Sequence, residues 1–403
     1  MRTNKYLNLK NFSFILLSVL IVITGCKKDN STVNPESPVF IPNPLCFTAE
    51  EGGVTIMMGS VSKTTTLDDR GINRNIEYSF DKNNWERFSV GTTLITLDSV
   101  GDKVYFRGNN PDGFNIYHLG NIYFITNDKK IAASGNVMSL IDTTCKSTTI
   151  PEDFSFMYMF SGTSITTAPE LPATTLAYGC YDKMFAFCNN LTVAPELPAT
   201  TLAHSCYSGM FEGCASLTAT PELPATTLAT QCYAYMFSNC DNLIDAPELP
   251  ATVLSETCYL GMFSRCDNLK NAPKLPVMTL AKCCYKEMFD GCVSLTTAPE
   301  LPATTLEEGC YMFMFKDCEN LTTSPELPAT TLVKRCYWEM FNGCNRLNNI
   351  KVHFTEWDDD IYDNATYRWV KNVSSSGTFH CPSSLPQEFG NHCIPEGWTV
   401  ETF

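Results

Sequence analysis

The feature that most constrains this chain is an internal repeat of 26 residues. One cysteine recurs at this spacing seven times, at Cys180, Cys206, Cys232, Cys258, Cys284, Cys310 and Cys336. A second column lies eight residues further on, at Cys188, Cys214, Cys240, Cys266, Cys292, Cys318 and Cys344. Around both columns the pattern L-T-x-A-P-E-L-P-A-T-T-L-x-x-x-C-Y-x-x-M-F-x-x-C is kept with few changes. A fixed period in the twenties predicts a solenoid, in which each unit buries its apolar face against its neighbours.

The two halves of each repeat predict different local structures. In the second half, the apolar residues Cys206, Tyr207, Met210, Phe211 and Cys214 lie at i, i+1, i+4, i+5 and i+8. This spacing is typical of one apolar face of a two-turn helix. In the first half, two prolines per repeat exclude helix and limit a strand to about three or four residues. We therefore expect an α+β fold, with one short strand and one short helix in every repeat.

The unit resembles leucine-rich repeats in its period and layout. The segment Met210-Phe211-Glu212-Gly213-Cys214-Ala215-Ser216-Leu217 occupies the place of A-F-x-G-C-x-x-L, the core of BspA-type leucine-rich-repeat surface proteins of anaerobic Gram-negative bacteria. This chain departs from that pattern in unit length, in Met for Ala, and in the added cysteine column. The resemblance implies a curved solenoid and a role in surface attachment, and it names no receptor.

A different pattern precedes the repeats. Short runs rich in β-branched and aromatic residues alternate with Gly, Asn and Asp clusters, at 54–58, 76–80, 85–88, 93–97 and 103–107. These runs predict a small antiparallel β-sandwich. The segment from Tyr78 to Trp85 resembles a hairpin of bacterial immunoglobulin-like and fibronectin-like modules. Its tip, Asp81 to Asn84, could bind calcium, but no glycine follows at the required loop position, which favours a turn.

The N-terminus carries a predicted export signal. Three basic residues precede an apolar run from Phe14 to Ile23, which is too short to span a bilayer and is typical of a signal peptide. The following Ile23-Thr24-Gly25-Cys26 resembles a bacterial lipobox, in which the cysteine becomes the lipid-bearing first residue. The resemblance implies that Cys26 attaches the protein to a membrane, with a Pro-rich tether behind it. We expect an outer-membrane lipoprotein at the cell surface, and the periplasmic face stays open.

These patterns give a complete domain layout. The predicted parts are a signal peptide (1–25), a lipidated cysteine and tether (26–45), a β-sandwich (46–128), an N-terminal cap with a degenerate first repeat (129–170), the solenoid (171–349) and a C-terminal cap (350–403). In the last part, Cys381 and Cys393 are close enough in sequence to form a disulfide. The repeat cysteines could be bridged or could be buried free thiols, since an unbroken helix would hold i and i+8 too far apart to bond.

One repeat position is almost always acidic. Glutamate occupies it at Glu170, Glu196, Glu222, Glu248, Glu300 and Glu326, with Lys274 as the exception. Stacked coils would align these residues into an acidic line. The line is either a solvated edge that keeps the protein soluble or a site for a cationic partner or calcium.

Composition excludes several functions. With 28 basic and 43 acidic residues, the net charge is −15, which argues against nucleic acid as a partner. No hydrolase, metalloprotease or phosphate-loop motif is present, and the five histidines do not cluster with other ligands. We therefore predict no catalytic residues, no metal site and no cofactor.

The sequence thus predicts a monomeric, non-enzymatic surface lipoprotein whose solenoid binds host or neighbouring-cell protein. The alternative is a glycan-binding accessory lipoprotein of a nutrient-uptake system, with the ligand on the sandwich. Exposed rings at Trp85 and Tyr105 would favour this alternative, and buried rings would count against it.

Overall fold

The computed structural model describes residues 42–403 except 62–73, 115–120, 359 and 361. The predicted signal peptide, the lipid-attachment site Cys26 and most of the tether therefore lie outside the described residues. Within the described part of the chain, no helix has the length and apolar character needed to cross a membrane.

The first described part of the chain consists of two antiparallel sheets. Its strands are β1 (Leu45–Ala49), β2 (Val54–Val61), β3 (Ile76–Ser79), β4 (Glu86–Arg87), β5 (Ile95–Leu97), β6 (Lys103–Gly108), β7 (Asn121–Thr126) and β8 (Ile131–Ser134). One sheet has the order β4-β3-β6-β1-β8 and the other the order β5-β2-β7. The rings of Phe47 and Phe106 in the first sheet lie 4.9 and 5.2 Å from the ring of Phe124 in the second. The sheets therefore pack face to face around an aromatic core, as a sandwich.

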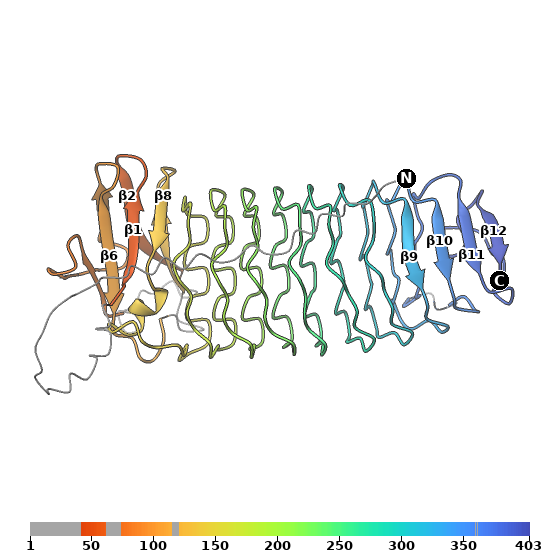
Figure 1. The fold of residues 1–403 in the computed structure, drawn as a ribbon, viewed down its shortest axis with the longest axis horizontal. Coiled ribbons are helices and arrows are strands. Elements are labelled where there is room, and N and C mark those ends of the chain that lie inside the picture. The colour runs from red at the N-terminus through yellow and green to blue at the C-terminus, as the bar shows by residue number, and fades with distance from the viewer. Residues whose placement is uncertain (1–41, 62–73, 115–120, 359, 361) are drawn as a thin grey trace, which may run out of the picture. The chain divides into compact units, whose positions relative to one another are not determined.

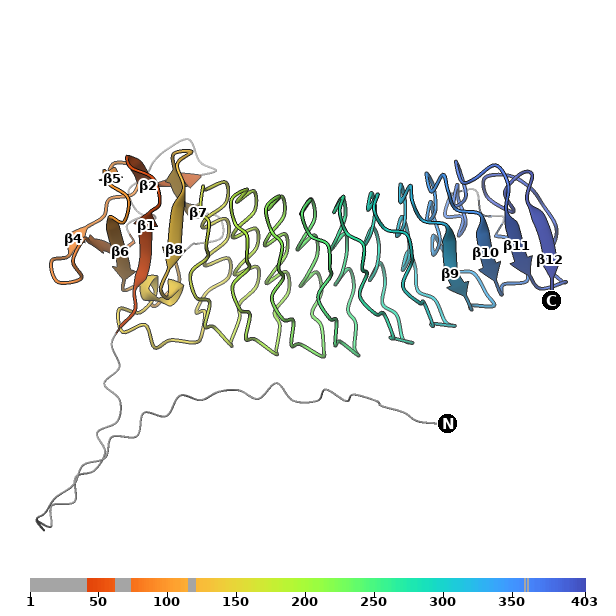
Figure 2. The ribbon, with the colours of Figure 1, turned by 45° about the horizontal axis from the view of Figure 1, so that its top comes forward.

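Beyond β8 the chain winds into coils that follow one another in chain order (Figures 1 and 2). We call residues 191–202 and their equivalents in the other coils the strand wall, and residues 177–189 and their equivalents the turn wall. Between the two walls lie columns of fully buried Cys, Tyr, Met, Phe and Leu side chains, one member per coil. The core is therefore continuous along the whole stack.

The turn wall is not helical. Every fourth residue has a left-handed backbone, as at Gly179 (φ 55°), Lys183 (φ 52°) and Phe187 (φ 61°), which an α-helix does not allow. Hydrogen bonding alternates along the segment: Asp182 N donates to Gly179 O three residues back (3.0 Å), whereas Tyr181 N donates to Cys206 O of the next coil (3.0 Å). The segment is a row of tight turns, half of whose N–H groups join one coil to the next.

The predicted α+β fold class, with a short helix in each repeat, is therefore wrong. Among the described residues, the single helical segment is the 3₁₀ helix η1 (Val137–Leu140), which lies outside the repeats. The apolar pattern at i, i+1, i+4, i+5 and i+8 is produced by turns of four residues instead of helical turns of 3.6. Such turns stabilise the stack because they leave backbone groups available for the neighbouring coil, whereas a helix bonds its N–H groups internally.

Aromatic side chains stack in two columns along the turn wall. From Phe185 to Phe341 the ring centroids of successive coils lie 5.6–5.9 Å apart, and from Tyr181 to Tyr337 they lie 5.8–6.1 Å apart. The rings are nearly parallel. The coil spacing is therefore almost constant from one end of the solenoid to the other.

The sandwich closes the N-terminal end of this stack. Ile131 of β8 forms a parallel bridge with Ile165 of the first coil. On the other wall, the ring of Phe124 in β7 stacks on Phe160 (5.4 Å), and the ring of Phe114 stacks on Phe156 (6.2 Å). The sandwich thus continues both walls of the solenoid and covers its first coil.

The C-terminal end keeps the coil but changes its sequence. Four strands form a parallel sheet in the strand wall: β9 (Thr323–Leu327), β10 (Asn349–Val352), β11 (Thr378–Cys381) and β12 (Thr399–Thr402). The turn wall also continues, because Phe341 N donates to Trp369 O (2.8 Å). Among its described residues, the C-terminal cap therefore contains a further coil and no helix.

Candidate interaction surface

The repeated Pro-Glu-Leu-Pro segment forms the middle of the strand wall. Extended backbone points alternate side chains to opposite faces, so that Leu197 and Ala199 are buried while Glu196 and Thr200 are exposed. The same alternation recurs in all seven coils, with Lys274 exposed in the one coil that lacks the glutamate. We call each of these four-residue segments, from 169–172 to 325–328, a rung. The seven rungs are nearly identical and follow one another along the strand wall.

Adjacent rungs are not joined by backbone hydrogen bonds. Coils are bonded just before the segment, where Thr218 N donates to Thr192 O (3.0 Å), and just after it, where Thr252 N donates to Thr226 O (2.9 Å). Among the described residues, no backbone hydrogen bond links one of the seven segments from 169–172 to 325–328 with the next. Two of every four residues are prolines, which have no N–H to donate.

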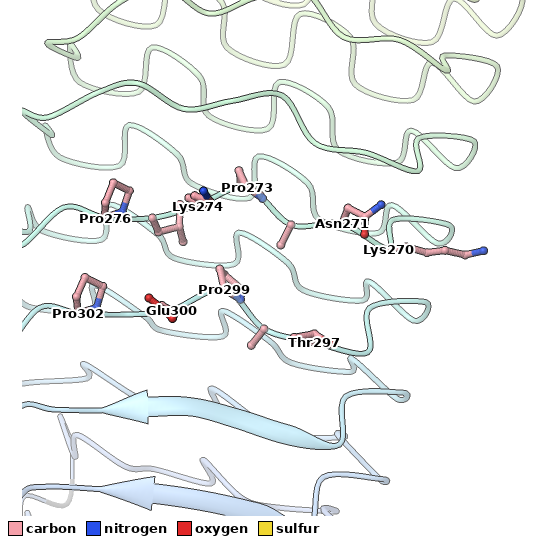
Figure 3. Close-up of a pocket in the computed structure, with 12 residues that line it drawn as sticks. Lys270, Asn271, Pro273, Lys274, Pro276, Thr297, Pro299, Glu300 and Pro302 are labelled. Atoms are coloured by element: carbon pink, nitrogen blue, oxygen red, sulfur yellow. The ribbon is translucent and has the colours of Figure 1, made fainter. Parts of the chain in front are cut away.

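Grooves lie at three of the six places where these bonds are missing. One groove of about 350 Å³ lies between residues 169–172 and 195–198, and another of about 320 Å³ lies between 221–224 and 247–250. A third groove, of about 810 Å³, lies between residues 270–276 and 297–302. Figure 3 shows this groove, with prolines of two neighbouring coils along it and Lys274 and Glu300 on successive rungs. Each groove has apolar proline rings on both sides and a charged side chain at each rung.

The six glutamates of the acidic line occupy equivalent exposed positions, but the two at the ends have partners. Glu326 accepts bonds from Lys351 Nζ (2.9 Å) and His353 Nε2 (2.6 Å), which lower the pKa of its carboxyl group. Glu170 accepts a longer bond from Asn43 Nδ2 (3.4 Å). The remaining four, Glu196, Glu222, Glu248 and Glu300, form no ion pair or side-chain hydrogen bond with any described residue. Their carboxylates are available to a partner.

The charges of the turn wall are, by contrast, largely paired within the protein. Lys183 Nζ lies 3.0 Å from Glu212 Oε2, and Lys316 Nζ lies 3.8 Å from Glu339 Oε2. The hydroxyl of Tyr235 reaches across one coil to donate to Glu287 Oε2 (3.0 Å). The sequence of this wall varies more between repeats than that of the strand wall. Several of its charged side chains pair with side chains of other coils.

Every described cysteine is a free thiol. All seven thiols of the second column lie within hydrogen-bonding distance of a Phe carbonyl oxygen of the preceding coil, as for Cys214 Sγ and Phe185 O (3.1 Å). Burial raises the pKa of Cys258 and Cys266 to about 12, so that they stay protonated. Of the two cysteines for which we predicted a disulfide, Cys381 is buried in β11, and Cys393 Sγ lies 3.9 Å from Glu388 Oε2.

No group of three or more Cys, His, Asp or Glu side chains among the described residues could hold a metal ion. At the hairpin tip, the carboxylate of Asp81 accepts the N–H groups of Asn83 and Asn84, both at 2.8 Å. These bonds lower the pKa of Asp81 and close a turn around its carboxylate, whose Oδ2 atom also accepts a bond from Asn84 Nδ2 (2.7 Å). The tip is therefore organised as a turn.

The two rings that would have favoured a glycan site are half-buried and lie beside cations. The guanidinium of Arg107 lies over the ring of Trp85 at 4.0 Å, and Lys82 Nζ lies over the ring of Tyr105 at 4.6 Å. The indole N–H of Trp85 donates to Lys82 O (3.0 Å). Neither ring forms the open flat platform that stacking on a sugar requires.

The coil sequence also identifies the family of the repeats. Residues 180–299 and 261–368 match the family model described as the BspA type leucine rich repeat region, in six copies. Residues 180–368 are thus BspA-like leucine-rich repeats. No curated protein matches the chain. The BspA-type repeats supply both walls of the solenoid and six of the seven Pro-Glu-Leu-Pro or Pro-Lys-Leu-Pro rungs, from 195–198 onward.

Sequence reasoning located the charged residues of this surface but not its grooves. It treated the prolines only as interruptions of the strand, whereas in the BspA-type stack they form the groove walls. It also missed Lys351 in β10 and His353 just after that strand, both of which bind Glu326. Their position, 25 and 27 residues after that glutamate and thus about one repeat later, was the available signal.

Proposed function

We propose that this protein is a non-enzymatic cell-surface lipoprotein, anchored through Cys26, whose strand wall binds an extracellular protein. The observation that carries the proposal is the ladder of BspA-type rungs with four carboxylates that no described residue neutralises. Repeat solenoids present such extended surfaces to protein partners. The uniform rungs suit a partner with a regular, extended surface better than a small molecule.

The test is a binding screen of the chain from Ser31 onward against extracellular-matrix proteins and a glycan array in parallel. Deleting the sandwich would expose the first coil, because Phe124 stacks on Phe160, so the surfaces are compared by point substitution. Replacing Glu196, Glu222 and Glu248 with lysine alters only exposed side chains of the strand wall. Replacing Trp85 and Tyr105 with alanine alters the sandwich.

Saturable protein binding that the triple lysine variant loses, and that the Trp85/Tyr105 variant keeps, supports the proposal. Glycan binding with the opposite pattern would contradict it and move the function to the sandwich. The anchor is tested separately: Cys26→Ser should release the protein from the membrane fraction, and labelling of intact cells with an impermeant reagent should reach the lipidated form. Labelling only after cell lysis would overturn the surface location.

A further inference from the structure

The chemistry of the groove walls selects a particular kind of side chain. Proline rings line both sides of each groove, and the free carboxylates of Glu196, Glu222 and Glu248 lie at the rungs. Lysine and arginine combine an apolar stem with a cationic head, so that the stem can contact apolar surface while the head stays near an anion. These are the side chains that match a proline-walled groove beside a carboxylate.

The spacing of the Pro-Glu-Leu-Pro segments selects a particular backbone. Parallel bridges flank these segments, as between Val193 and Ala219 and between Thr227 and Val253, and such bridges hold neighbouring strands about 4.8 Å apart. In an extended chain, side chains on one face lie about 6.6 Å apart, at every second residue. The difference of about 2 Å per rung adds up to about 5 Å over the three steps from Glu170 to Glu248. The long, flexible stems of lysine side chains can span this difference when the segment is centred on the run.

We propose that the strand wall binds an extended segment of its protein partner, running along the stack, with lysine or arginine at every second residue and one such side chain at each rung. The inference rests on the proposed function, and it names the partner's chemistry. The binding region is the run of four rungs from Glu170 to Glu248. Lys274 ends that run, because its cation repels the next basic side chain of the segment.

The first test compares peptides of one composition. Lys-Thr repeated six times places lysines on one face at every second residue, whereas Lys-Lys-Lys-Thr-Thr-Thr repeated twice does not. Binding to the chain from Ser31 onward is measured by fluorescence anisotropy at about 50 mM salt, where charge interactions are weakly screened. We expect the alternating peptide to bind at least about tenfold more tightly, since it pairs more rungs at once. Equal affinities would overturn the proposal and leave only bulk charge attraction.

The second test alters the rungs. Glu222→Lys should weaken the alternating peptide about tenfold, because it replaces attraction by repulsion in the middle of the run. Glu307→Lys, an exposed site on the turn wall, makes the same charge change and should have little effect. Lys274→Glu should tighten binding of a longer alternating peptide about fivefold by joining Glu248 to Glu300. Equal losses in Glu222→Lys and Glu307→Lys would overturn the proposal.

The third test asks whether the grooves themselves are used. Diaminopropionic acid keeps the ammonium of lysine on a much shorter stem, which cannot fill the space between the prolines. Replacing every lysine in the alternating peptide with it should weaken binding at least about fivefold. Unchanged affinity would show that the carboxylates act alone. If the peptides do not bind while a matrix protein does, this inference is refuted and the proposed function stands. If no extracellular protein binds in the screen, the proposed function itself is refuted.

Discussion

Asp182 lies in the turn wall, and its carboxyl group is largely buried with too few hydrogen-bond partners. Its Oδ1 atom is buried and accepts no hydrogen bond from a described residue. Desolvation therefore raises the pKa of Asp182 to about 6, although Lys183 and Ser208 act in the opposite direction. A similar burial raises the pKa of Asp290 to about 6 in a later coil. Each of these two carboxyl groups therefore lowers the free energy of unfolding at neutral pH.

The raised pKa of Asp182 predicts how the stability of the protein changes with pH. A carboxyl whose pKa is higher in the folded state favours folding while protonated, so that its contribution is most favourable below about pH 4 and is lost as pH rises through about 6. We expect Asp182→Asn to raise the free energy of unfolding at pH 7.5 by up to about 2 kcal/mol, with a smaller gain at pH 4.5. Urea titration at the two pH values measures both. The exposed Asp267→Asn is the control, and an equal gain at both pH values would contradict the assignment.

The turn wall shows most clearly what the sequence could and could not predict. An apolar pattern at i, i+1, i+4, i+5 and i+8 stays within one helix face over two turns, so it cannot separate a 3.6-residue period from a 4-residue one. The positions of the glycines could have distinguished the two periods. Gly209 and Gly213 lie four residues apart at positions of left-handed backbone, where glycine is favoured, whereas a helix interior disfavours it.

The strand wall was more predictable. Period, proline content and the acidic position can all be read within one repeat, and they place Glu196 and its equivalents on one surface. The grooves could not be predicted, because they depend on missing hydrogen bonds between two segments that lie 26 residues apart. Sandwich strands β1, β7 and β8 were also missed, since Leu45–Ala49 lay at the predicted tether boundary and Ile131–Ser134 was assigned to the cap.

Left-handed backbone at Thr257 gives a prediction for this element. Its φ of 54° is costly for a β-branched residue, and its side chain forms no hydrogen bond with a described residue. We expect Thr257→Gly to raise the free energy of unfolding by about 1 kcal/mol, because relief of strain exceeds the added entropy of the unfolded chain. Thr252→Gly, in the extended strand wall, should lower it instead. Chemical denaturation of both variants checks the pair, and a loss of stability in both would contradict this account.

At the scale of the whole molecule, the sandwich and the solenoid share one core. Phe47, Phe124 and Phe160 contact one another across the junction, and the ring column continues from there to Phe341. A solenoid needs a cap because its terminal coil would otherwise expose its core. The sandwich therefore stabilises the repeats as well as forming a structure of its own.

Removing the Phe124 ring should destabilise both the sandwich and the first coil of the solenoid, because this ring contacts both Phe47 and Phe160. We expect Phe124→Ala to lower the free energy of unfolding by about 3–5 kcal/mol, as for other buried phenylalanines. Native-state hydrogen exchange should then accelerate first in the coil that contains Phe156 and Phe160, more than in coils near Phe341. Phe80→Ala, at an exposed ring of the sandwich, is the control. Unchanged exchange in the first coil would mean that the sandwich does not cap the repeats.

The hydrogen bonds between coils of the turn wall all point the same way. In every coil the N–H of the earlier turn donates to the C=O of the later one, from Phe156 and Cys180 to Phe341 and Trp369. Alternate peptide groups are therefore aligned along the stack, and their dipoles add as they do in an α-helix, but with the opposite polarity. The solenoid consequently has its own electric axis. Its positive pole faces the C-terminal coil and its negative pole faces the sandwich.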